Sequence, residues 1–330
     1  MNELVTAVFA AQSSAHLLDA PRTARFAAFL RGFDEAAYRH DLARRGFRWV
    51  PRGDPAFPSR LQSIHDPPPG LFLRGDAPIE LLERPSIAVV GARACSSYGS
   101  TVATSLGREL AAAGVVVVSG LARGIDAAAH RGALEAGTTV AVLGCGIDRD
   151  YPRAHAPLAA QIAATGLILS EYPPGVEPAP WRFPARNRIV AGLARATVVV
   201  EARERSGALI TADLALDEGR EVLTVPGEIT SQLSKGTNAL LRLGATPVTC
   251  AADVLNAIGI EPAPLPEPPA LAGPAARVRA VVADAPAAAD ELIRRTGLTA
   301  GELAAALAEL ELLGLVTQAD GLYREVMQPT

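Results

Sequence analysis

The sequence predicts an α/β fold, with an extended Rossmann-like, mostly parallel sheet, a small helical N-terminal domain and a C-terminal winged-helix domain. Three features lead to this prediction. Apolar runs rich in β-branched residues alternate with segments of helical periodicity at 85–260, which is the pattern of βαβ units. A proline-rich linker without basic residues follows at 261–274. Residues 275–330 then give helix, helix, turn, helix and hairpin, the order of a winged helix.

The segments before residue 85 are expected to differ from the sheet domain in their secondary structure. Residues 1–50 are predicted to form short helices, because Phe26, Phe29 and Phe33 recur at helical spacing. Residues 51–84 contain the turn-rich run FPSRLQSIHDPPPGLFLRGD, which predicts an extended connector. We expect this connector to pack on the next domain, since its leucine and phenylalanine side chains need burial.

Seven strands and several helices are expected at 85–260. The helices include 99–113 and 125–136, whose apolar residues have helical periodicity. Ligands bind parallel sheets beyond the carboxyl ends of the strands, so the loops that follow the strands are the expected place for a site. The predicted strands lie near 87–90, 115–118, 139–143, 167–169, 197–200, 221–225 and 246–249.

Composition favours a globular, cytoplasmic protein. Apolar residues make up 49% of the chain and the net charge is −4, but the apolar runs are far shorter than the roughly 20 residues of a membrane-spanning helix. The first residues hold an acid and no basic region, so a secretory signal is not expected. Cys95, Cys145 and Cys250 are odd in number and far apart, which favours buried thiols over disulfides or metal ligands. No cofactor is predicted.

The segment 181–195, WRFPARNRIVAGLAR, carries four arginines and no acid. The planar guanidiniums of Arg182, Arg186 and Arg188 are suited to phosphates. Trp181 and Phe183 are candidates for stacking on bases or covering the sheet edge, with core packing favoured for Trp181. This segment is therefore the first candidate for a phosphate-binding surface.

Glycine- and serine-rich turns follow several of the predicted strands. Backbone amides in such turns, and the N-termini of the helices that they open, bind anions. The stretch VVGARACSSYGS lacks a clean G-x-G-x-x-G, so dinucleotide binding has little support. Asp126 is interpreted as a first-turn acid favoured by the helix dipole, and His130 as a packing residue. The turns contribute Gly91 and Arg93; Ser119, Gly120, Arg123 and Gly124; Ser206 and Gly207; and the single lysine Lys235 with Asn238.

The C-terminal domain has the wrong charge for a typical DNA-binding winged helix. Residues 274–330 hold five basic and eight acidic side chains, and the candidate recognition helix at 299–314 has three acids and no base. Such a helix would repel phosphate. We therefore predict a partner-contact or regulatory role for this domain rather than DNA binding.

The order of the motifs resembles the DNA-processing protein A family, also called DprA or Smf. After the connector motif come IAVVGAR, VVSGLARGIDAAAH, VAVLGCGIDRDYP, LILSEYPPG, FPARNRIVAGLA, SGALITADLALDEGREVLTVPG and SKGTNALLRLGA, together covering about 51–260. The resemblance implies a non-catalytic homodimer that binds single-stranded DNA and has an N-terminal domain of the sterile-alpha-motif type. It also implies that the protein protects incoming strands in natural transformation and recombination, and loads RecA past single-strand-binding protein.

The resemblance further implies a DNA-binding site without catalytic or metal-binding residues. The pattern departs from the family at Pro180, where a basic residue is expected before the FPARNR motif, and Arg182 is the candidate substitute. The implied DNA-binding residues are Gly91, Arg93, Ser119, Gly120, Arg123, Gly124, Arg182, Phe183, Arg186, Asn187, Arg188, Ser206, Gly207, Lys235 and Asn238.

Two alternatives belong to other classes of protein. A Rossmann-type nucleoside monophosphate phosphoribohydrolase would use similar turns with a catalytic arginine and glutamate, for which Glu171 and Glu201 are candidates. Against it, the chain has SGALITA at the strand-to-helix turn where those hydrolases share a PGG-x-GT signature. The other alternative is an adaptor that acts through the acidic winged helix.

Overall fold

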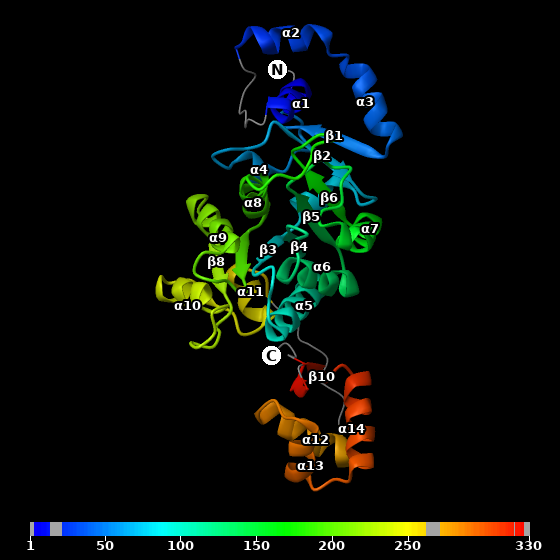
Figure 1. Cartoon of the computed structure of the whole chain (residues 1–330), viewed down its shortest axis with the longest axis vertical. Coiled ribbons are helices and arrows are strands. Elements are labelled where there is room, and N and C mark those ends of the chain that lie inside the picture. Colours follow the sequence, from blue (N-terminus) through cyan, green and yellow to red (C-terminus); the bar gives the residue numbers. More distant parts are fainter. Residues whose placement is uncertain (1–2, 14–21, 262–270, 320, 327–330) are drawn as a thin grey trace. The chain divides into compact units, whose positions relative to one another are not determined.

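The computed structural model describes residues 3–13, 22–261, 271–319 and 321–326 (Figure 1). The chain divides into one compact unit up to Ile260 and a second from Glu261 onward. The predicted finer division of the first unit, with boundaries near 50 and 84, stays a prediction. In the described part of the chain, no helix is both long and apolar enough to span a bilayer.

A nine-stranded sheet forms the centre of the first unit, in the order β1-β2-β6-β5-β4-β3-β7-β8-β9. The seven strands from β3 onward are parallel, and β1 and β2 extend the sheet in antiparallel pairing next to β6. The strands are β1 (Phe47–Pro51), β2 (Gly70–Arg74), β3 (Ser86–Val90), β4 (Val116–Ser119), β5 (Thr139–Leu143), β6 (Leu167–Ser170), β7 (Ala196–Val199), β8 (Glu221–Thr224) and β9 (Thr246–Pro247).

The order of the strands reverses between β3 and β7. From β3 the chain adds β4, β5 and β6 on one side, then returns to add β7, β8 and β9 on the other. Crevices at such a reversal, beyond the carboxyl ends of the strands, are where open α/β sheets bind ligands. The topology alone therefore marks the loops after β3 and β7.

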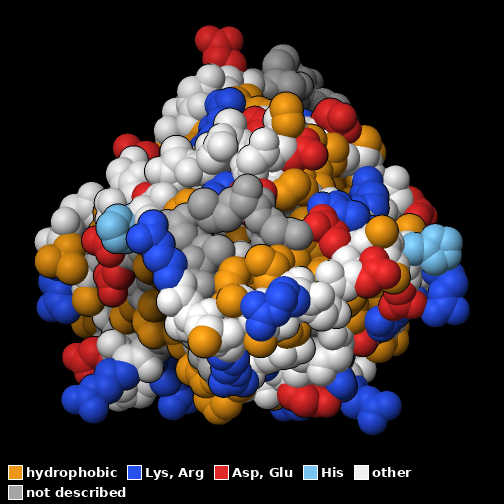
Figure 2. All heavy atoms as spheres, turned by 90° about the horizontal axis from the view of Figure 1, so that it is seen from above, with side chains coloured by type: hydrophobic (Ala, Val, Ile, Leu, Met, Phe, Trp, Pro, Cys, Tyr) orange, Lys and Arg blue, Asp and Glu red, His pale blue; other side chains and the backbone are white. Residues whose placement is uncertain are grey.

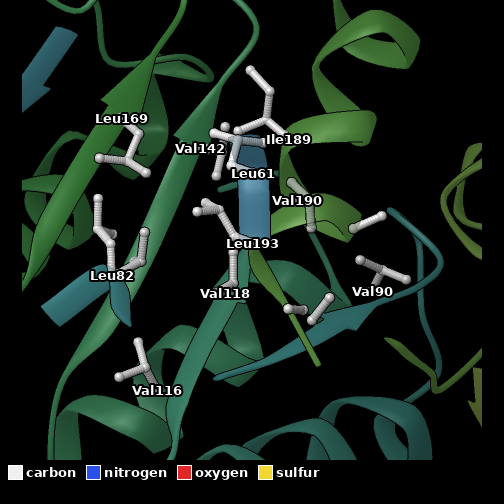
Figure 3. Close-up of a cluster of buried hydrophobic side chains, with 14 of the residues drawn as sticks. Leu61, Leu82, Val90, Val116, Val118, Val142, Leu169, Ile189, Val190 and Leu193 are labelled. Atoms are coloured by element: carbon white, nitrogen blue, oxygen red, sulfur yellow. The ribbon is translucent and has the colours of Figure 1, made fainter. Parts of the chain in front are cut away.

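Both faces of the sheet are covered by helices, so side chains on both faces are buried. One face packs on α4 (Ser59–Gln62), α8 (Arg182–Leu193) and α9 (Gly207–Asp217), and Figure 3 shows Ile189, Val190 and Leu193 of α8 beside Val118 and Val142. The other face packs on α1 (Glu3–Ser13), α3 (Glu35–Arg44), α6 (Ile125–Ala136) and α7 (Ala156–Thr165). These contacts fix the start of α8 at the carboxyl ends of the strands.

Glycines let α5 (Ser97–Ala112) and α6 approach closely. A Cβ at Gly132 would lie 1.9 Å from the Thr104 carbonyl oxygen, and one at Gly107 would lie 2.3 Å from that of Ala129. No side chain fits at either position without moving a helix. The remaining elements of this unit are α2 (Ala24–Gly32), η1 (Ile79–Glu83), η2 (Arg153–His155), α10 (Lys235–Arg242) and α11 (Ala251–Ala257).

The second unit is a winged helix with its own apolar core. It consists of α12 (Gly273–Asp284), α13 (Ala289–Thr296), α14 (Ala300–Leu312) and the antiparallel hairpin β10 (Val316–Ala319) and β11 (Leu322–Glu325). Gly297 ends α13 in the left-handed conformation at φ 68°, and Thr299 with Glu302 forms a capping box on α14. The predicted fold class is confirmed. Part of the predicted linker, residues 262–270, lies outside the described residues.

Two predictions made from the sequence need correction. The segment 51–84 is not only an extended connector, because it supplies β2, which pairs with β1 and β6 in the sheet. The thiols are not all buried: Cys145 is, and burial raises its pKa to about 11, but Cys95 and Cys250 are only partly buried. The expected burial of the connector's Leu61, Ile64 and Leu71–Leu73 is confirmed.

Candidate functional site

A pocket of about 430 Å³ lies at the reversal of strand order. Its walls come from the loops after β3, β4, β7 and β8 and from α6, α8 and α9, which lie far apart in the sequence. Eight of the predicted site residues line it: Gly91, Arg93, Gly120, Phe183, Arg186, Asn187, Ser206 and Gly207.

The wall after β4 is built around a buried polar cluster. The Asp126 carboxylate accepts the backbone N–H groups of Gly120 at 3.1 Å and Ala122 at 3.3 Å. Arg186 donates from Nη1 to the Gly120 carbonyl at 2.8 Å and to the Val142 carbonyl. Burial raises the pKa of Asp126, and the Arg186 charge opposes this rise. Asp126 is thus a first-turn acid, as predicted, and it also fixes the turn.

Gly120 leaves room for the Arg186 guanidinium in this wall. A Cβ at Gly120 would lie 2.3 Å from Nη2 of Arg186. Gly124, at φ 73°, precedes α6 in a conformation that L-residues avoid, and its Cβ would meet the Ala92 carbonyl oxygen at 2.2 Å. The glycines of this turn therefore shape the pocket, although they have no side chain that could contact a ligand.

Phe183 is the aromatic side chain of the pocket, and it belongs to a stack. The Tyr151 ring lies 5.3 Å from the Phe183 ring, centroid to centroid, at 26°, and the Arg93 guanidinium carbon lies 5.4 Å from the Phe183 centroid. Tyr151 is also exposed. Sequence reasoning missed Tyr151, because it sits in the loop after β5 and its contact with α8 is not local.

Four arginines line the pocket, and Asp126 is the single acid among the described lining residues. Arg203 and Arg205 complete this set with Arg93 and Arg186. Both are exposed, and neither forms a hydrogen bond or ion pair within the ranges that the structure describes. The turn ARERSG contains both arginines and could have indicated them from the sequence, but the predicted site includes only the serine and the glycine of this turn.

On one face of the molecule, the basic side chains are mixed with acidic ones. On the face drawn in Figure 2, Lys and Arg side chains are interspersed with Asp and Glu around the rim, in keeping with the net charge of −4. The pocket differs from this face because its four arginines are accompanied by one acid among the described lining residues. Its electrostatic potential therefore favours an anion.

Arg188 and Arg182 lie away from the pocket wall. Arg188 donates to the Glu171 carboxylate at 3.0 and 2.7 Å and to Asp66 at 2.9 Å. Arg182 is buried, donates to the Glu177 carbonyl, and lies over the Trp181 and Tyr172 rings. Both arginines thus make intramolecular contacts, and their predicted part in DNA binding stays a prediction.

Trp181 does not pack in the core, contrary to our preference from the sequence. It is the N-cap residue of α8 and keeps 39% of its surface exposed. The preference failed because Trp181 lies at the end of the helix, beyond the apolar face of α8 that covers the sheet.

The other predicted residues shape loops near the pocket. Ser119 is fully buried, and its hydroxyl donates to the Val89 carbonyl at 2.6 Å. Asn238 exchanges two hydrogen bonds with the backbone of Gly227, at 3.0 and 3.3 Å. Arg123 and Lys235 are exposed and stand outside the pocket lining. His130 is buried and bonds Thr139 at 2.7 Å, so its predicted packing role is confirmed.

Both glutamates that a hydrolase would need are engaged elsewhere. Glu171 is bound by Arg188, and Glu201 accepts the backbone N–H of Ser96 at 2.9 Å together with the Ser96 hydroxyl. Neither belongs to the described lining of the pocket.

Comparison with known proteins decides the family. Residues 48–259 match the family described as DNA recombination-mediator protein A, and residues 261–321 match the DprA winged helix domain. The chain belongs to the DNA-processing protein A family. The similarity covers both units, and the second unit is the DprA winged helix domain.

Curated DprA relatives and solved DprA structures share much of this chain. The DNA processing protein DprA of Streptococcus pneumoniae is 47% identical over 207 residues, 61% of this chain and 71% of the relative. The putative DprA of Mycobacterium tuberculosis is 41% identical over 303 residues, which are 86% of this chain and 78% of the relative.

Two solved DprA structures show the same fold. The S. pneumoniae crystal structure superposes with a TM-score of 0.67 at 39% identity. The match covers 77% of this chain and 92% of the S. pneumoniae chain. The Helicobacter pylori structure, which describes the single-stranded DNA binding mode of that protein, has a TM-score of 0.58 at 32% identity, with coverage of 64% and 94%.

Proposed function

We propose that this DprA-family protein binds single-stranded DNA in the pocket between the ends of β3 and β7, protects the strand and passes it to RecA. The observation that carries the proposal is the lining of four arginines and one acid around an aromatic ring. The single-stranded DNA binding mode of the H. pylori relative supports it. The proposed setting is natural transformation and recombination in the cytoplasm.

The arginines divide into two groups with different tasks. Arg186 is buried and held by two carbonyl oxygens, so it sets a fixed positive charge in the wall. Arg93, Arg203 and Arg205 are exposed and can reach the phosphates of a strand that lies across the pocket. The amides of the glycine turns at Gly91 and Gly207 add donors for the same phosphates.

Bases are contacted by stacking in this proposal. Phe183 supplies a ring at the pocket wall, and every base has a face that stacks on an aromatic ring. Phosphate contacts carry no sequence information. Binding should therefore show little preference for sequence and should weaken as salt is added.

The test is fluorescence anisotropy of labelled single-stranded and duplex oligonucleotides over a salt series. The variant Arg203→Ala/Arg205→Ala should bind single strands at least about 10-fold more weakly at low salt, and its plot of log affinity against log salt should flatten by about 0.7 for each phosphate that the protein no longer neutralises. Arg31→Ala/Arg131→Ala, which removes two exposed arginines outside the pocket, is the matched control. Equal binding by the two double variants would refute the assignment of the pocket.

Large apolar side chains that the described chain leaves exposed are candidates for the interface of the proposed homodimer. Ile210 and Leu216 of α9, Ile229 of the loop after β8 and Leu243 after α10 are all exposed. We propose that some of these side chains are covered by the second copy of the chain. Sedimentation of the wild type and of Ile229→Asp/Leu243→Asp tests this part, since two charges should dissociate the dimer and a monomeric wild type would contradict it.

Delivery to RecA is tested separately from binding. RecA filaments should form faster on a strand coated with single-strand-binding protein when the wild type is added, and the Arg203→Ala/Arg205→Ala variant should not accelerate them. Incubation of the protein with AMP should release no adenine, because neither candidate glutamate faces the pocket. Release of base at a rate that depends on Glu171 or Glu201 would favour the hydrolase instead.

A further inference from the structure

Two buried charged side chains in the lining of the pocket each keep one polar atom without a partner. Asp126 is 6% exposed and Arg186 is 4% exposed, and both line the pocket. Asp126 uses Oδ2 to accept the N–H groups of Gly120 and Ala122, and its Oδ1 has no hydrogen-bond partner in the described ranges. Polar atoms of buried side chains are nearly always hydrogen-bonded, so this oxygen calls for a donor from outside the chain.

The Arg186 guanidinium has one nitrogen in the same situation. Its Nε donates to Asn187 Oδ1 at 3.2 Å, and its Nη1 donates to the carbonyl oxygens of Gly120 and Val142. Among the residues that the structure describes, none accepts from Nη2. Asp126 binds the N–H of Gly120, and Arg186 binds its carbonyl oxygen. The wall therefore holds one uncommitted acceptor and one uncommitted donor, fixed around the same residue.

A phosphate does not match this pair. Its oxygens could accept from Arg186, but a phosphodiester has no donor for Asp126 and carries the same charge as the carboxylate. The amides of the turn are also in use. Leu121, at φ 57°, lies between Gly120 and Ala122, and such turns direct backbone N–H groups at an anion. Asp126 fills that anion position itself, so the phosphates of a strand belong to the exposed arginines of the pocket.

We infer that Asp126 and Arg186 bind the Watson–Crick edge of one unpaired base of the strand. This inference rests on the proposed function. Every base carries an acceptor beside an N–H donor on that edge, as O4 and N3–H do in thymine, and proteins read unstacked bases there. Phe183 lines the same pocket and provides the stacking surface that usually accompanies such contacts. In a duplex the edge is paired with the other strand, so this contact selects single strands.

The experiment compares an oligothymidylate of roughly 16 nucleotides with a strand of the same length in which every thymine carries a methyl group on N3. This methyl group removes the N3–H donor. In anisotropy titrations the full chain should bind the methylated strand about 10- to 100-fold more weakly, the value of one hydrogen bond to a charged group. An oligodeoxyuridylate, which lacks the thymine methyl group away from the Watson–Crick edge, is the control and should bind nearly as tightly as the oligothymidylate.

Asp126→Asn separates the contact with the base from the part that Asp126 plays in the turn. The amide keeps an oxygen for the two backbone N–H groups but loses the charge and the second acceptor. This variant should lose most of the discrimination between the two strands. Asp213→Asn, at an exposed acid of α9 outside the lining, should keep it. The ratio of the two affinities is measured on one protein sample, so partial unfolding of a variant does not change it.

The possible outcomes separate this inference from the proposed function. Equal binding of the two strands by the wild type, or unchanged discrimination in Asp126→Asn, would overturn the inference and leave the proposed function intact. An Asp126→Asn variant that binds both strands more tightly by the same factor would indicate a phosphate beside Asp126 and would also overturn it. Anisotropy that shows no binding of any strand would overturn both.

Discussion

The Arg188 guanidinium and the Glu171 carboxylate form a doubly hydrogen-bonded ion pair whose side chains are 10% and 6% exposed. Arg188 comes from α8 and Glu171 follows β6, so the pair ties the helix that carries Phe183 to the sheet. An arginine in the motif that suggested phosphate binding thus holds that motif in position.

Removing one member of this pair should destabilise the fold. We expect Arg188→Ala to lower the free energy of unfolding by about 3–5 kcal/mol, because Glu171 would be left buried and unpaired. Arg188→Met/Glu171→Leu should recover most of that loss, since neither charge then remains. Urea denaturation measures both. The exposed pair Arg39–Glu35 is the control, and Arg39→Ala should cost less than about 1 kcal/mol.

The contact between Gly120 and Arg186 predicts a steric defect. Gly120→Ala should displace the Arg186 guanidinium and cost about 1–3 kcal/mol of stability, with weaker binding of single strands as a result. Gly207→Ala is the matched glycine, because nothing lies within 4 Å of a Cβ there and it begins a helix. We expect thermal unfolding of that variant to be unchanged or slightly raised. A drop of similar size in both variants would contradict the prediction.

Stacking on Phe183 should depend on the ring rather than on hydrophobic size. Phe183→Ala is expected to weaken single-strand binding by about 1–3 kcal/mol in every sequence tested, and Phe183→Tyr to weaken it little. Phe183→Leu separates area from stacking and should resemble the alanine variant. Anisotropy titrations against thymidine- and adenosine-only strands provide the measurement. A leucine variant that binds like the wild type would count against stacking.

His130 should make folding sensitive to acid. Burial lowers its pKa to about 3, below the unfolded value of about 6.5, so below pH 6.5 the unfolded chain binds the proton first. The contribution of neutral His130 to the free energy of unfolding is complete above about pH 6.5. Below that pH it falls by about 1.4 kcal/mol per pH unit, down to about pH 3. Between about pH 7 and pH 5, wild type should therefore lose about 2 kcal/mol more than His130→Asn, which has no titrating ring. Urea titrations at both pH values test this, and parallel losses would contradict it.

The two units should separate cleanly. A chain ending near Ile260 should keep its single-strand affinity within about 3-fold, because all residues that line the pocket lie in the first unit. Anisotropy of the shortened chain tests this. The acidic winged helix alone should not bind duplex DNA, since its three acids on the candidate recognition helix repel phosphate. Loss of RecA delivery with retained binding would assign the partner contact to this unit.

Much of the fold was accessible from the sequence because its signals are local. The apolar runs at 87–90, 139–143 and 167–169 predicted β3, β5 and β6 closely, and 125–136 coincides with α6. The strand β2 was missed because its short run GLFLR follows three prolines and pairs with β6, far along the chain. Pairing between distant segments leaves no mark on local periodicity.

The three arginines of α8 show where prediction of the site from the sequence reaches its limit. On a helix, residues two apart lie on different faces, so Arg188 could be expected to point away from Arg186. The identity of its partners could not be predicted, because Glu171 and Asp66 reach it through tertiary folding. Tyr151 was missed for the same reason, since only the folded chain brings it to Phe183.

The lining of the pocket runs from Val90 to Leu233. A ribosome therefore completes every part of the site well before it reaches the proline-rich segment and the winged helix. During synthesis the pocket can form on the nascent chain while the second unit is still untranslated. A premature stop codon early in that second unit would keep every residue that lines the pocket and remove the winged helix. If the pocket binds single strands as proposed, such a product would compete with the full-length protein for them.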